Sequence, residues 1–432
     1  MRLPSPARFR ASRDARQRSR GRVCIVRQTS DYEPQLQRVA EALVHAGFEV
    51  ELLCMRHPER PRTVRVRGVK ITSLPASRNR SSGARYAVDY AWFFMLAAAT
   101  LAGRHLRRPY VAIQMYTMPD FLVFAAFVPK LLGARVIAYM NEPSPELFET
   151  LYGSARLRRA LEWIEQRVLR FSDHAITVTE ELKQRYVERG ANADRISVVL
   201  NAADPSTRRS GWSPAEPAPN GHFTVISHGA VEDRYGQDTI IEAARMLRDE
   251  LPDLRVVFTG RGSGVEDMLR MIEAAEMEDI VSFEGWVTVQ RLNDLLHTSD
   301  VGIVAQKGSP YSHLVHTYKM VDYWIFGLPV IASRLRAVSN LYDDSVIEYY
   351  EPDDAQDLAR AIKRLHDDPQ WRGELARNGR LAHERHGWAA QRVKFLGVYD
   401  ALLGGQNRFP VSALSPAFGD LIQDRQESLA ES

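Results

Sequence analysis

Hydrophobic positions along the chain follow two alternating periods. Short β-branched runs such as 22–27 are followed by stretches of helical spacing, for example Leu36, Val39, Ala40 and Leu43. The alternation continues to about residue 200, with one strand expected over 64–74, and it restarts at residue 223. Strands alternating with helices predict parallel sheets covered on both faces. The pattern therefore predicts the α/β class, as two Rossmann-like doubly wound domains.

A break in the pattern separates the two halves. Residues 201–221 contain four prolines and two glycines and show no periodicity, which is typical of a linker. Ligands of such sheets bind at the carboxyl ends of the strands, so two halves facing each other predict a cleft with a site between them. The predicted divisions are a basic, disordered arm at 1–21, an N-terminal domain at 22–204, a linker at 205–221, a C-terminal domain at 222–385, a crossover helix at 386–403 and a disordered tail at 404–432.

Charge is distributed unevenly along the 432 residues. The formal net charge is +3, but residues 1–22 hold eight arginines and one aspartate, a local +7 that leaves −4 for the rest. A slightly acidic body argues against a nucleic-acid partner, because nucleic-acid-binding domains usually carry a basic face. The arm itself could contact anionic lipid, RNA or a protein, or be a disordered tail without a partner.

The cysteines and the apolar segments indicate the cellular compartment in which the protein is expected. Cys24 and Cys54 each lie in an apolar, strand-like run and are predicted to be buried, inert thiols of a reducing compartment. No apolar segment follows the N-terminal arginines as in a secretory signal, so a cytoplasmic location is expected. The most apolar stretch, 91–102, is shorter than the roughly 20 residues of a spanning helix. It predicts either an ordinary domain helix or a patch that rests on a membrane.

One loop and helix in the second half carry candidate chemistry. The strand at 301–305 leads into an irregular loop and then a helix predicted over 317–326. The N-terminus of a helix offers free N–H groups and a partial positive charge that suit phosphate, and Lys319 would add a full charge there. Asp322, three residues on, could accept paired hydroxyls such as those of a ribose. The alternative is an ion pair between Lys319 and Asp322 on a solvated helix.

Several segments together carry a resemblance to a known family. They occur in the family's order at 116–124, 143–148, 227–243, 258–264, 283–287 and 318–330. Over roughly residues 22–400 the chain resembles glycosyltransferase family 4, the retaining, nucleotide-sugar-dependent enzymes with the GT-B fold. Arg234-Tyr-Gly resembles a phosphate-loop variant of one bacterial branch. The run of glycines from Gly260 to Gly264 is instead interpreted as a tight strand–helix turn, not as a dinucleotide fingerprint.

The resemblance implies roles for particular residues. The implied catalytic residues are Asn141, Glu142 and Lys319. The implied donor-binding residues are Gly229, Arg234, Trp286, Val287, Thr317, Tyr318, Lys319 and Asp322. Arg38 and Asp120 are implied to lie at the acceptor side or the cleft. Two alternatives stay open: Trp286 could pack in the core, and Arg38 could simply solvate its helix.

The sequence departs from the family pattern at four positions. Ala230 stands where the family usually has arginine, and Tyr235 where it has lysine, although Arg234 is adjacent. Leu314 stands where the upstream glutamate is expected, and Asn141 where the first-domain histidine is expected. The helix dipole, Lys319 and Arg234 would then have to balance the charge of the leaving diphosphate.

The expected function follows from the resemblance. We expect a metal-independent, retaining hexosyltransferase that moves a sugar from a nucleoside-diphosphate sugar to a saccharide or lipid-linked acceptor in envelope polysaccharide or glycoconjugate biosynthesis. The nucleotide sugar is a substrate, so no cofactor is expected, and a peripheral position at the inner face of the membrane fits a lipid-linked acceptor. Alternatives from other classes are a non-catalytic nucleotide-sugar-binding or scaffold protein and a nucleotide-sugar epimerase.

Overall fold

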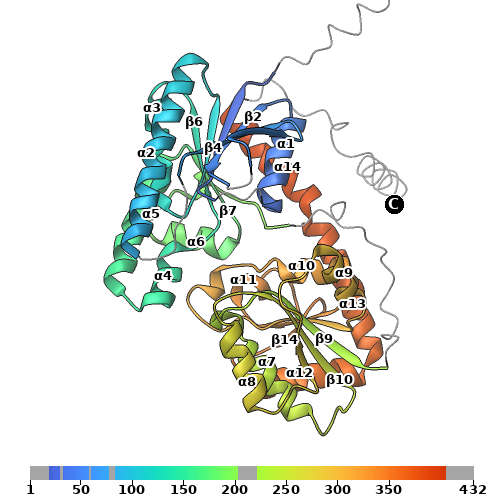
Figure 1. Ribbon diagram of the computed structural model, residues 1–432. Helices are drawn as coiled ribbons and strands as arrows, with labels where there is room; N and C mark the ends of the chain where they lie inside the picture. Colours follow the sequence, from blue (N-terminus) through green and yellow to red (C-terminus); the bar gives the residue numbers. More distant parts are fainter. Residues whose placement is uncertain (1–18, 30–32, 58–59, 77–82, 203–220, 405–432) are drawn as a thin grey trace, which may run out of the picture.

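The computed structural model describes residues 19–29, 33–57, 60–76, 83–202 and 221–404 (Figure 1). Except for residues 19–21, 221 and 404, the predicted arm, linker and C-terminal tail lie outside the described residues. The described ranges include most of both predicted domains and the whole of the predicted crossover helix.

The N-terminal domain is built on an eight-stranded sheet in the order β3-β4-β2-β1-β5-β6-β7-β8. Its strands are β1 (Arg22–Val26), β2 (Glu49–Met55), β3 (Thr63–Val66), β4 (Val69–Leu74), β5 (Ala112–Tyr116), β6 (Arg135–Met140), β7 (His174–Thr177) and β8 (Ile196–Val198). All neighbours pair in parallel except β3 and β4. The single strand expected over 64–74 is therefore wrong, because the chain reverses at Arg67 and Gly68, which both have positive φ.

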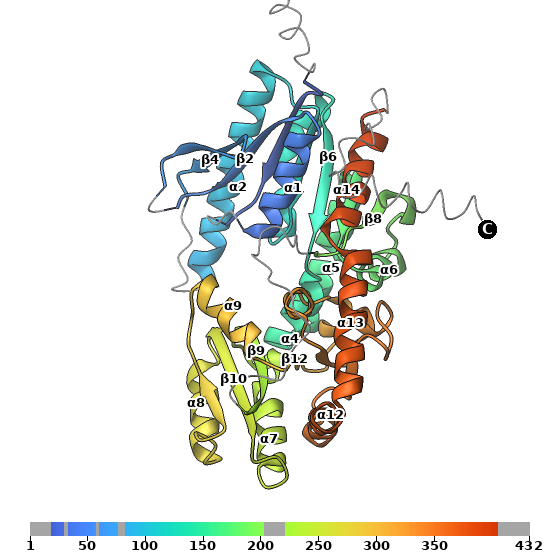
Figure 2. The ribbon, with the colours of Figure 1, turned by 90° about the vertical axis from the view of Figure 1, so that its right-hand side faces the viewer.

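Helices cover both faces of this sheet. They are α1 (Pro34–His45), α2 (Gly83–Arg107), α3 (Phe127–Leu131), α4 (Ser144–Tyr152), α5 (Ala155–Phe171) and α6 (Glu180–Glu188), with 3₁₀ turns η2 (Asp120–Ala126) and η3 (Ala193–Arg195). Figures 1 and 2 show α2, α3 and α5 on one face and α1 on the other.

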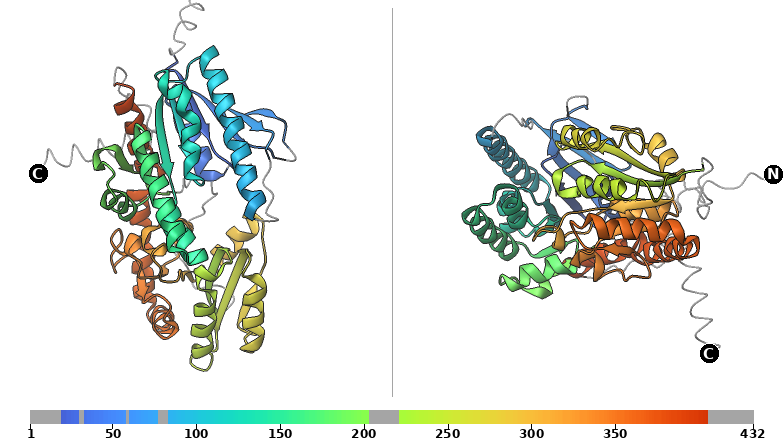
Figure 3. Two further views of the ribbon diagram at one scale, coloured as in Figure 1. Left: turned by 90° about the vertical axis from the view of Figure 1, so that its left-hand side faces the viewer. Right: turned by 90° about the horizontal axis from the view of Figure 1, so that it is seen from below.

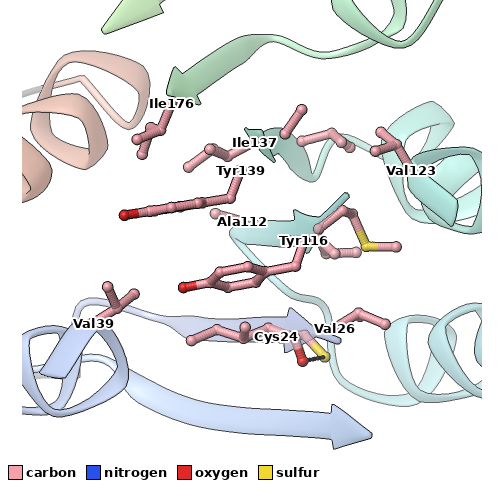
Figure 4. Close-up of a cluster of buried hydrophobic side chains, with 14 of the residues drawn as sticks. Cys24, Val26, Val39, Ala112, Tyr116, Val123, Ile137, Tyr139 and Ile176 are labelled. Atoms are coloured by element: carbon pink, nitrogen blue, oxygen red, sulfur yellow. Dashed lines mark hydrogen bonds between the residues drawn. The ribbon is translucent and has the colours of Figure 1, made fainter. Parts of the chain in front are cut away.

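The core of the domain lies where β1, β5 and β6 run side by side. Tyr116 of β5 and Tyr139 of β6 stack there with ring centroids 4.6 Å apart (Figure 4). Cys24 of β1 is buried beside them and Cys54 is also buried, as predicted for both thiols. Burial raises the pKa of both Cys24 and Cys54, which disfavours the reactive thiolate form.

The C-terminal domain repeats the architecture with six parallel strands in the order β11-β10-β9-β12-β13-β14. The strands are β9 (Phe223–Ala230), β10 (Leu254–Arg261), β11 (Val281–Phe283), β12 (Val301–Val304), β13 (Val330–Ser333) and β14 (Glu348–Tyr350). Its helices are α7 (Gln237–Leu247), α8 (Val265–Ala274), α9 (Val289–His297), α10 (Lys319–Ile325), α11 (Arg336–Ser339), α12 (Ala355–Asp367) and α13 (Pro369–His386), with 3₁₀ turns η5 (Asp233–Tyr235) and η6 (Ser312–Leu314). Two doubly wound α/β domains are therefore confirmed.

The last helix, α14 (Trp388–Leu402), returns to the N-terminal domain. Its Phe395 and Tyr399 are fully buried in the core of that domain. The Tyr399 hydroxyl donates a hydrogen bond to Gln114 Oε1 at 2.8 Å, and Gln391 Oε1 accepts one from the Leu200 amide at 3.0 Å. In Figure 2, α13 and α14 run as one column along both domains.

The start of the chain corrects one expectation about the basic arm. Arg20 pairs with Asp400 of α14 and lies over the Phe48 ring, 4.6 Å from its centroid. Arg22 belongs to β1 and pairs with Glu51 at 3.5 Å. Two of the eight arginines counted in residues 1–22 thus serve the folded domain and are not free for a partner.

Candidate active site between the two domains

The candidate site lies where the strand order of the C-terminal sheet switches direction. The chain leaves β9 toward β10 on one side, and it leaves β12 toward β13 on the other. A crevice opens at the carboxyl ends of two such strands. The two loops touch at Gly236, which has φ +63°, and a Cβ there would lie 1.9 Å from the Ala305 carbonyl oxygen. Glycine at this position therefore allows the close approach of the loops.

A cavity of about 330 Å³ occupies this crevice and is closed on one side by the N-terminal domain. It is lined by Glu142, Asn201, His228, Gly229, Ala230, Tyr235, Gln306, Tyr311, Val315, His316, Thr317, Tyr318, Lys319 and Asp322. The size is within the range of small-molecule sites. Glu142 comes from a loop at the end of β6, and Asn201 from the segment that follows β8.

Lys319 is the first residue of α10, two residues later than the predicted start of that helix. Its Nζ lies 4.4 Å from the centroid of the Tyr235 ring, and a Cβ on Gly229 would lie 3.0 Å from its Cε. Burial lowers the pKa of Lys319 to about 8, and the positive charge of Arg234 acts in the same direction. Among the described residues no carboxylate pairs with this ammonium group.

Asp322 does not form the alternative ion pair with Lys319. The carboxylate is buried, and its Oδ2 lies 3.6 Å from Nε2 of His228, the β9 residue that precedes Gly229. The His228 ring meets the Tyr323 ring edge to face at 5.1 Å. His228 lines the cavity although sequence reasoning did not assign it. Its place at a strand end, next to the glycine turn, was the available signal.

The first two departures from the family pattern both face the cavity. Ala230 and Tyr235 line it, and the Arg234 guanidinium carbon lies 5.0 Å from the Tyr235 ring centroid. Lys319 on α10 brings positive charge to the cavity itself, whereas Arg234 on η5 is not among the lining residues and acts from behind the Tyr235 ring, where its charge influences Lys319 and Glu142. The aromatic ring of Tyr235 contacts both cations, an arrangement in which the ring face attracts positive charge.

Glu142 connects the two domains across the cavity. The Tyr311 hydroxyl donates a hydrogen bond to its Oε2 at 2.7 Å. Burial raises the pKa of Glu142 above its ordinary value, although this hydrogen bond and the charge of Arg234 oppose the shift. Its neighbour Asn141 donates from Nδ2 to Gln35 Oε1 at 3.2 Å and does not line the cavity.

The remaining donor-side predictions fall in two places. Thr317 and Tyr318 line the cavity, and Thr317 Oγ1 accepts a hydrogen bond from the Lys319 amide at 3.2 Å. Trp286 and Val287 do not line it. The Trp286 side chain is 67% exposed, with the Arg261 guanidinium 4.3 Å from its ring centroid, so the alternative of core packing is wrong.

Both residues assigned to the acceptor side lie outside the cavity lining. Arg38 is buried, with its guanidinium 5.6 Å from the Tyr318 ring and 6.0 Å from the Trp388 ring, so it faces the other domain and is not solvated. Asp120 lies inside the N-terminal domain, where it accepts a hydrogen bond from Ser144 Oγ at 3.0 Å. Burial raises its pKa to about 6. Asp120 is therefore engaged by a partner of its own domain and is not among the residues that line the cavity.

Leu314, at the position of the expected upstream glutamate, is also away from the cavity lining. Its side chain is buried, and its carbonyl oxygen accepts a hydrogen bond from Thr179 Oγ1 of the N-terminal domain at 2.6 Å. The position therefore contributes a contact between the domains instead of a carboxylate.

Two facing Rossmann-like domains, with a cavity between them that is lined by the Lys319 ammonium group, are the architecture of proteins that bind nucleotide-activated groups. The family models agree with this class. Residues 32–202 match the glycosyl transferase 4-like domain, and residues 222–368 match the glycosyl transferases group 1 domain. The chain therefore belongs to the glycosyltransferases of family 4 type, with the GT-B fold.

Individual relatives are more distant. The chain is 26% identical over 233 residues to the D-inositol 3-phosphate glycosyltransferase of Arthrobacter sp. strain FB24, a match that covers 51% of this chain and 54% of that protein. The chain spans about half to three fifths of the length of the first curated relatives it matches.

Solved structures share the fold at low identity. Sucrose-phosphate synthase from Thermosynechococcus elongatus superposes with a TM-score of 0.72 at 18% identity, covering 90% of this chain and all of that chain. The Anabaena protein HepE in complex with UDP-glucose gives a TM-score of 0.66 at 15% identity, covering 88% and 100%. These likenesses establish the fold alone.

We predict that Lys319 titrates near pH 8, because its half-buried ammonium group is desolvated near another cation and has no carboxylate partner among the described residues. Lys307 is the internal reference: partial burial opposes the shift, but hydrogen bonds to Asp233 and Asp238 raise the pKa of Lys307. Reductive ¹³C-methylation followed by NMR titration measures both, with the Lys319→Arg variant assigning the signal. A Lys319 signal that titrates at the ordinary lysine value of about 10.4 would contradict the geometry described for this group.

Proposed function

We propose that the chain transfers a sugar from a nucleoside-diphosphate sugar, bound in the cavity, to a hydroxyl of an acceptor, with retention at the anomeric carbon and without a metal ion. The observation that carries the proposal is the ammonium group of Lys319. It lies beside Arg234 in the crevice at the switch point of the C-terminal sheet, with no carboxylate partner among the described residues. Such an uncompensated charge in a buried site favours an anionic ligand.

In the proposed reaction, each of these groups has a part. Negative charge develops on the diphosphate as the sugar leaves, and a cation held in a water-poor cavity stabilises that charge more than it would in water. A bound diphosphate also favours the protonated form of Lys319. The Asp322 carboxylate can accept the paired hydroxyls of a ribose. Glu142, more basic because of its burial, is placed on the side of the N-terminal domain to accept a hydrogen bond from the acceptor hydroxyl.

The structural neighbours indicate which donors to test first. HepE is solved with UDP-glucose, so uridine-diphosphate sugars are the first donor class for this chain, followed by guanosine-diphosphate sugars. Product analysis separates transfer from the alternatives. A new glycoside supports the proposal, an epimerised nucleotide sugar indicates an epimerase, and tight binding without turnover indicates a non-catalytic binding protein.

We expect Lys319→Ala to weaken binding of UDP about 10- to 100-fold, because a charge-assisted hydrogen bond to phosphate is lost. Isothermal titration calorimetry measures this effect. Lys307→Ala is the matched control, because the Lys307 ammonium lies 2.8 Å from Asp233 and from Asp238 and is already neutralised.

A second variant tests whether the affinity for UDP depends on the positive charge itself, by moving that charge to position 235. Lys319 Nζ lies next to the Tyr235 ring, so a lysine at position 235 can bring an ammonium group to nearly the same wall. The double variant Tyr235→Lys, Lys319→Ala should regain at least part of the lost affinity. Unchanged UDP binding in Lys319→Ala would remove this residue from the site and, with it, the observation on which the proposal rests.

We also propose that the acceptor is presented at a membrane surface, with the chain bound peripherally. None of the helices in the described part of the chain has the length and apolarity for a bilayer crossing. Yet the solvent face of α2 carries exposed apolar side chains at helical spacing, among which Trp92 is 54% and Met95 is 62% exposed. Phe127 and Leu131 of α3 are also exposed, and α3 packs beside α2. Exposed apolar surface of this extent marks an interaction site.

Charge on the neighbouring helix favours an anionic lipid surface as the partner. On α5, Arg156, Arg159, Arg167 and Arg170 are exposed at spacings of three, eight and three residues, which places them along one side with the exposed Trp163. The Arg167 guanidinium lies 4.7 Å from the Trp163 ring centroid. Basic residues combined with exposed aromatic and aliphatic side chains are typical of interfacial binding. Figure 3 shows α2 and α5 on the same face of the N-terminal domain.

We expect the protein to sediment with vesicles of phosphatidylcholine and phosphatidylglycerol, and less with phosphatidylcholine alone. The double variant Trp92→Ser, Met95→Ser should bind the mixed vesicles at least about tenfold more weakly, because the burial of two large apolar side chains is lost. Val393→Ser is the control, since Val393 is an exposed apolar residue of α14, which lies on the side of α1, away from α2 and α3 (Figure 1). A chain starting at residue 19 tests the basic arm separately. Equal vesicle binding by the double variant and the wild type would disprove this part of the proposal.

A further inference from the structure

Two buried, neutral side chains line the cavity with polar atoms that have no hydrogen-bond partner among the described residues. His316 is 6% exposed, and neither of its ring nitrogens is paired with another described residue. Gln306 is 2% exposed, and its Oε1 is likewise without a partner there. Burying such atoms unpaired costs free energy, and most buried polar groups in folded proteins are paired. Both residues line the cavity, so a ligand bound there can supply the missing hydrogen bonds.

The ring of His316 packs against other aromatic side chains, and none of these provides a hydrogen bond to its two nitrogens. The Tyr342 ring lies 5.7 Å away, and Tyr342 itself packs against the rings of Trp324 at 4.9 Å and His386 at 5.7 Å. This wall is aromatic, so it offers the imidazole packing but no hydrogen bond to either nitrogen.

The protonation state of His316 limits what it can bind. Burial lowers its pKa to about 4, and the charge of His386 adds to that effect. The ring is therefore neutral at physiological pH, with one nitrogen that donates and one that accepts a hydrogen bond. A hydroxyl group also donates and accepts, whereas a phosphate oxygen only accepts and is bound more strongly by a cation.

We propose that His316, together with Gln306, forms the hydroxyl-binding end of the cavity and reads the sugar of the donor. This assignment rests on the proposed function and deepens it. Lys319 and Arg234 bind the diphosphate, and the neutral pair binds hydroxyls of the transferred sugar. A site built to hydrogen-bond a hydroxyl discriminates strongly against a ligand that lacks it, because its own buried polar atoms are then left unpaired.

The neighbouring histidine shows that the arrangement is particular to position 316. His313 lies three residues earlier on the same loop, but its Nδ1 accepts a hydrogen bond from the Arg336 amide at 3.2 Å. It does not line the cavity. The two rings are therefore not a joint site, and His313 provides a matched control.

The test compares nucleoside diphosphates with their sugars by titration calorimetry, using UDP with UDP-glucose and GDP with GDP-mannose. For the pair that binds, His316→Phe should weaken binding of the nucleotide sugar about three- to tenfold and change binding of the nucleoside diphosphate less than about twofold. Phenylalanine keeps the packing against Tyr342 and removes the unpaired nitrogens. The melting temperature of the ligand-free variant should therefore be equal to or above that of the wild type.

Two further measurements separate direct recognition from a structural effect. Gln306→Leu should show the same selective loss, and His313→Phe should leave the ratio of the two affinities unchanged. Nucleotide-sugar analogues lacking one hydroxyl each identify the contact. One of them should bind the wild type more weakly, and His316→Phe should no longer distinguish it from the parent sugar.

The outcomes are distinguishable from failure of the proposed function. If the wild type binds a nucleoside diphosphate but both His316→Phe and Gln306→Leu leave its sugar bound as tightly, or weaken both ligands equally, the inference is wrong and the proposed function stands. If the wild type binds neither pair, the proposed function fails and the inference fails with it.

Discussion

The cavity depends on α14, the last helix, which follows the C-terminal domain and packs into the core of the N-terminal domain. Phe395 and Tyr399 of α14 are fully buried among strands that lie far from them in sequence. Burial of two large aromatic side chains contributes several kcal/mol, which is comparable with the net stability of a typical domain. The return therefore fixes the two sheets so that their carboxyl ends face each other. Only in that arrangement can Tyr311 of one domain donate its hydrogen bond to Glu142 of the other.

Within the cavity the polar groups are divided by charge. One wall is cationic, because Lys319 and Arg234 lie around the Tyr235 ring and no carboxylate of the described residues neutralises Lys319. Another part is neutral, because His316 and Gln306 carry no charge and keep polar atoms unpaired within the described part of the chain. In the absence of a ligand, both the unpaired charge and the unpaired polar atoms lower the free energy of unfolding. A nucleotide sugar has the complementary division, with an anionic diphosphate beside an uncharged ring of hydroxyls.

The sequence was informative where local pattern decides structure. The alternation of strand and helix periods predicted two doubly wound sheets, because both periods act over a few residues. Lys319 was placed at the start of the correct helix for the same reason. An error of this kind was the hairpin at Arg67 and Gly68, where a positive-φ turn divides the segment expected to be a single strand.

Side-chain placement across domains was not predictable in the same way. The partners of Arg38 and Glu142 come from the other domain, so no spacing along the chain indicates them. The resemblance implied that Asp120 lies at the acceptor side or the cleft, yet its carboxylate accepts a hydrogen bond from Ser144 within the N-terminal domain. The sequence provided no basis for assigning a role to His316, since the two unpaired ring nitrogens are evident only from the packing around Tyr342.

The most direct test of the central claim is a thermal-shift panel of uridine-, guanosine- and adenosine-diphosphate sugars on the wild type and on Lys319→Ala. A ligand at 100 times its dissociation constant should stabilise the folded protein by about 2.7 kcal/mol. We predict that at least one nucleotide sugar raises the melting temperature of the wild type, and that Lys319→Ala loses most of that shift. A panel in which no nucleotide sugar shifts the wild type would contradict a donor site in this cavity.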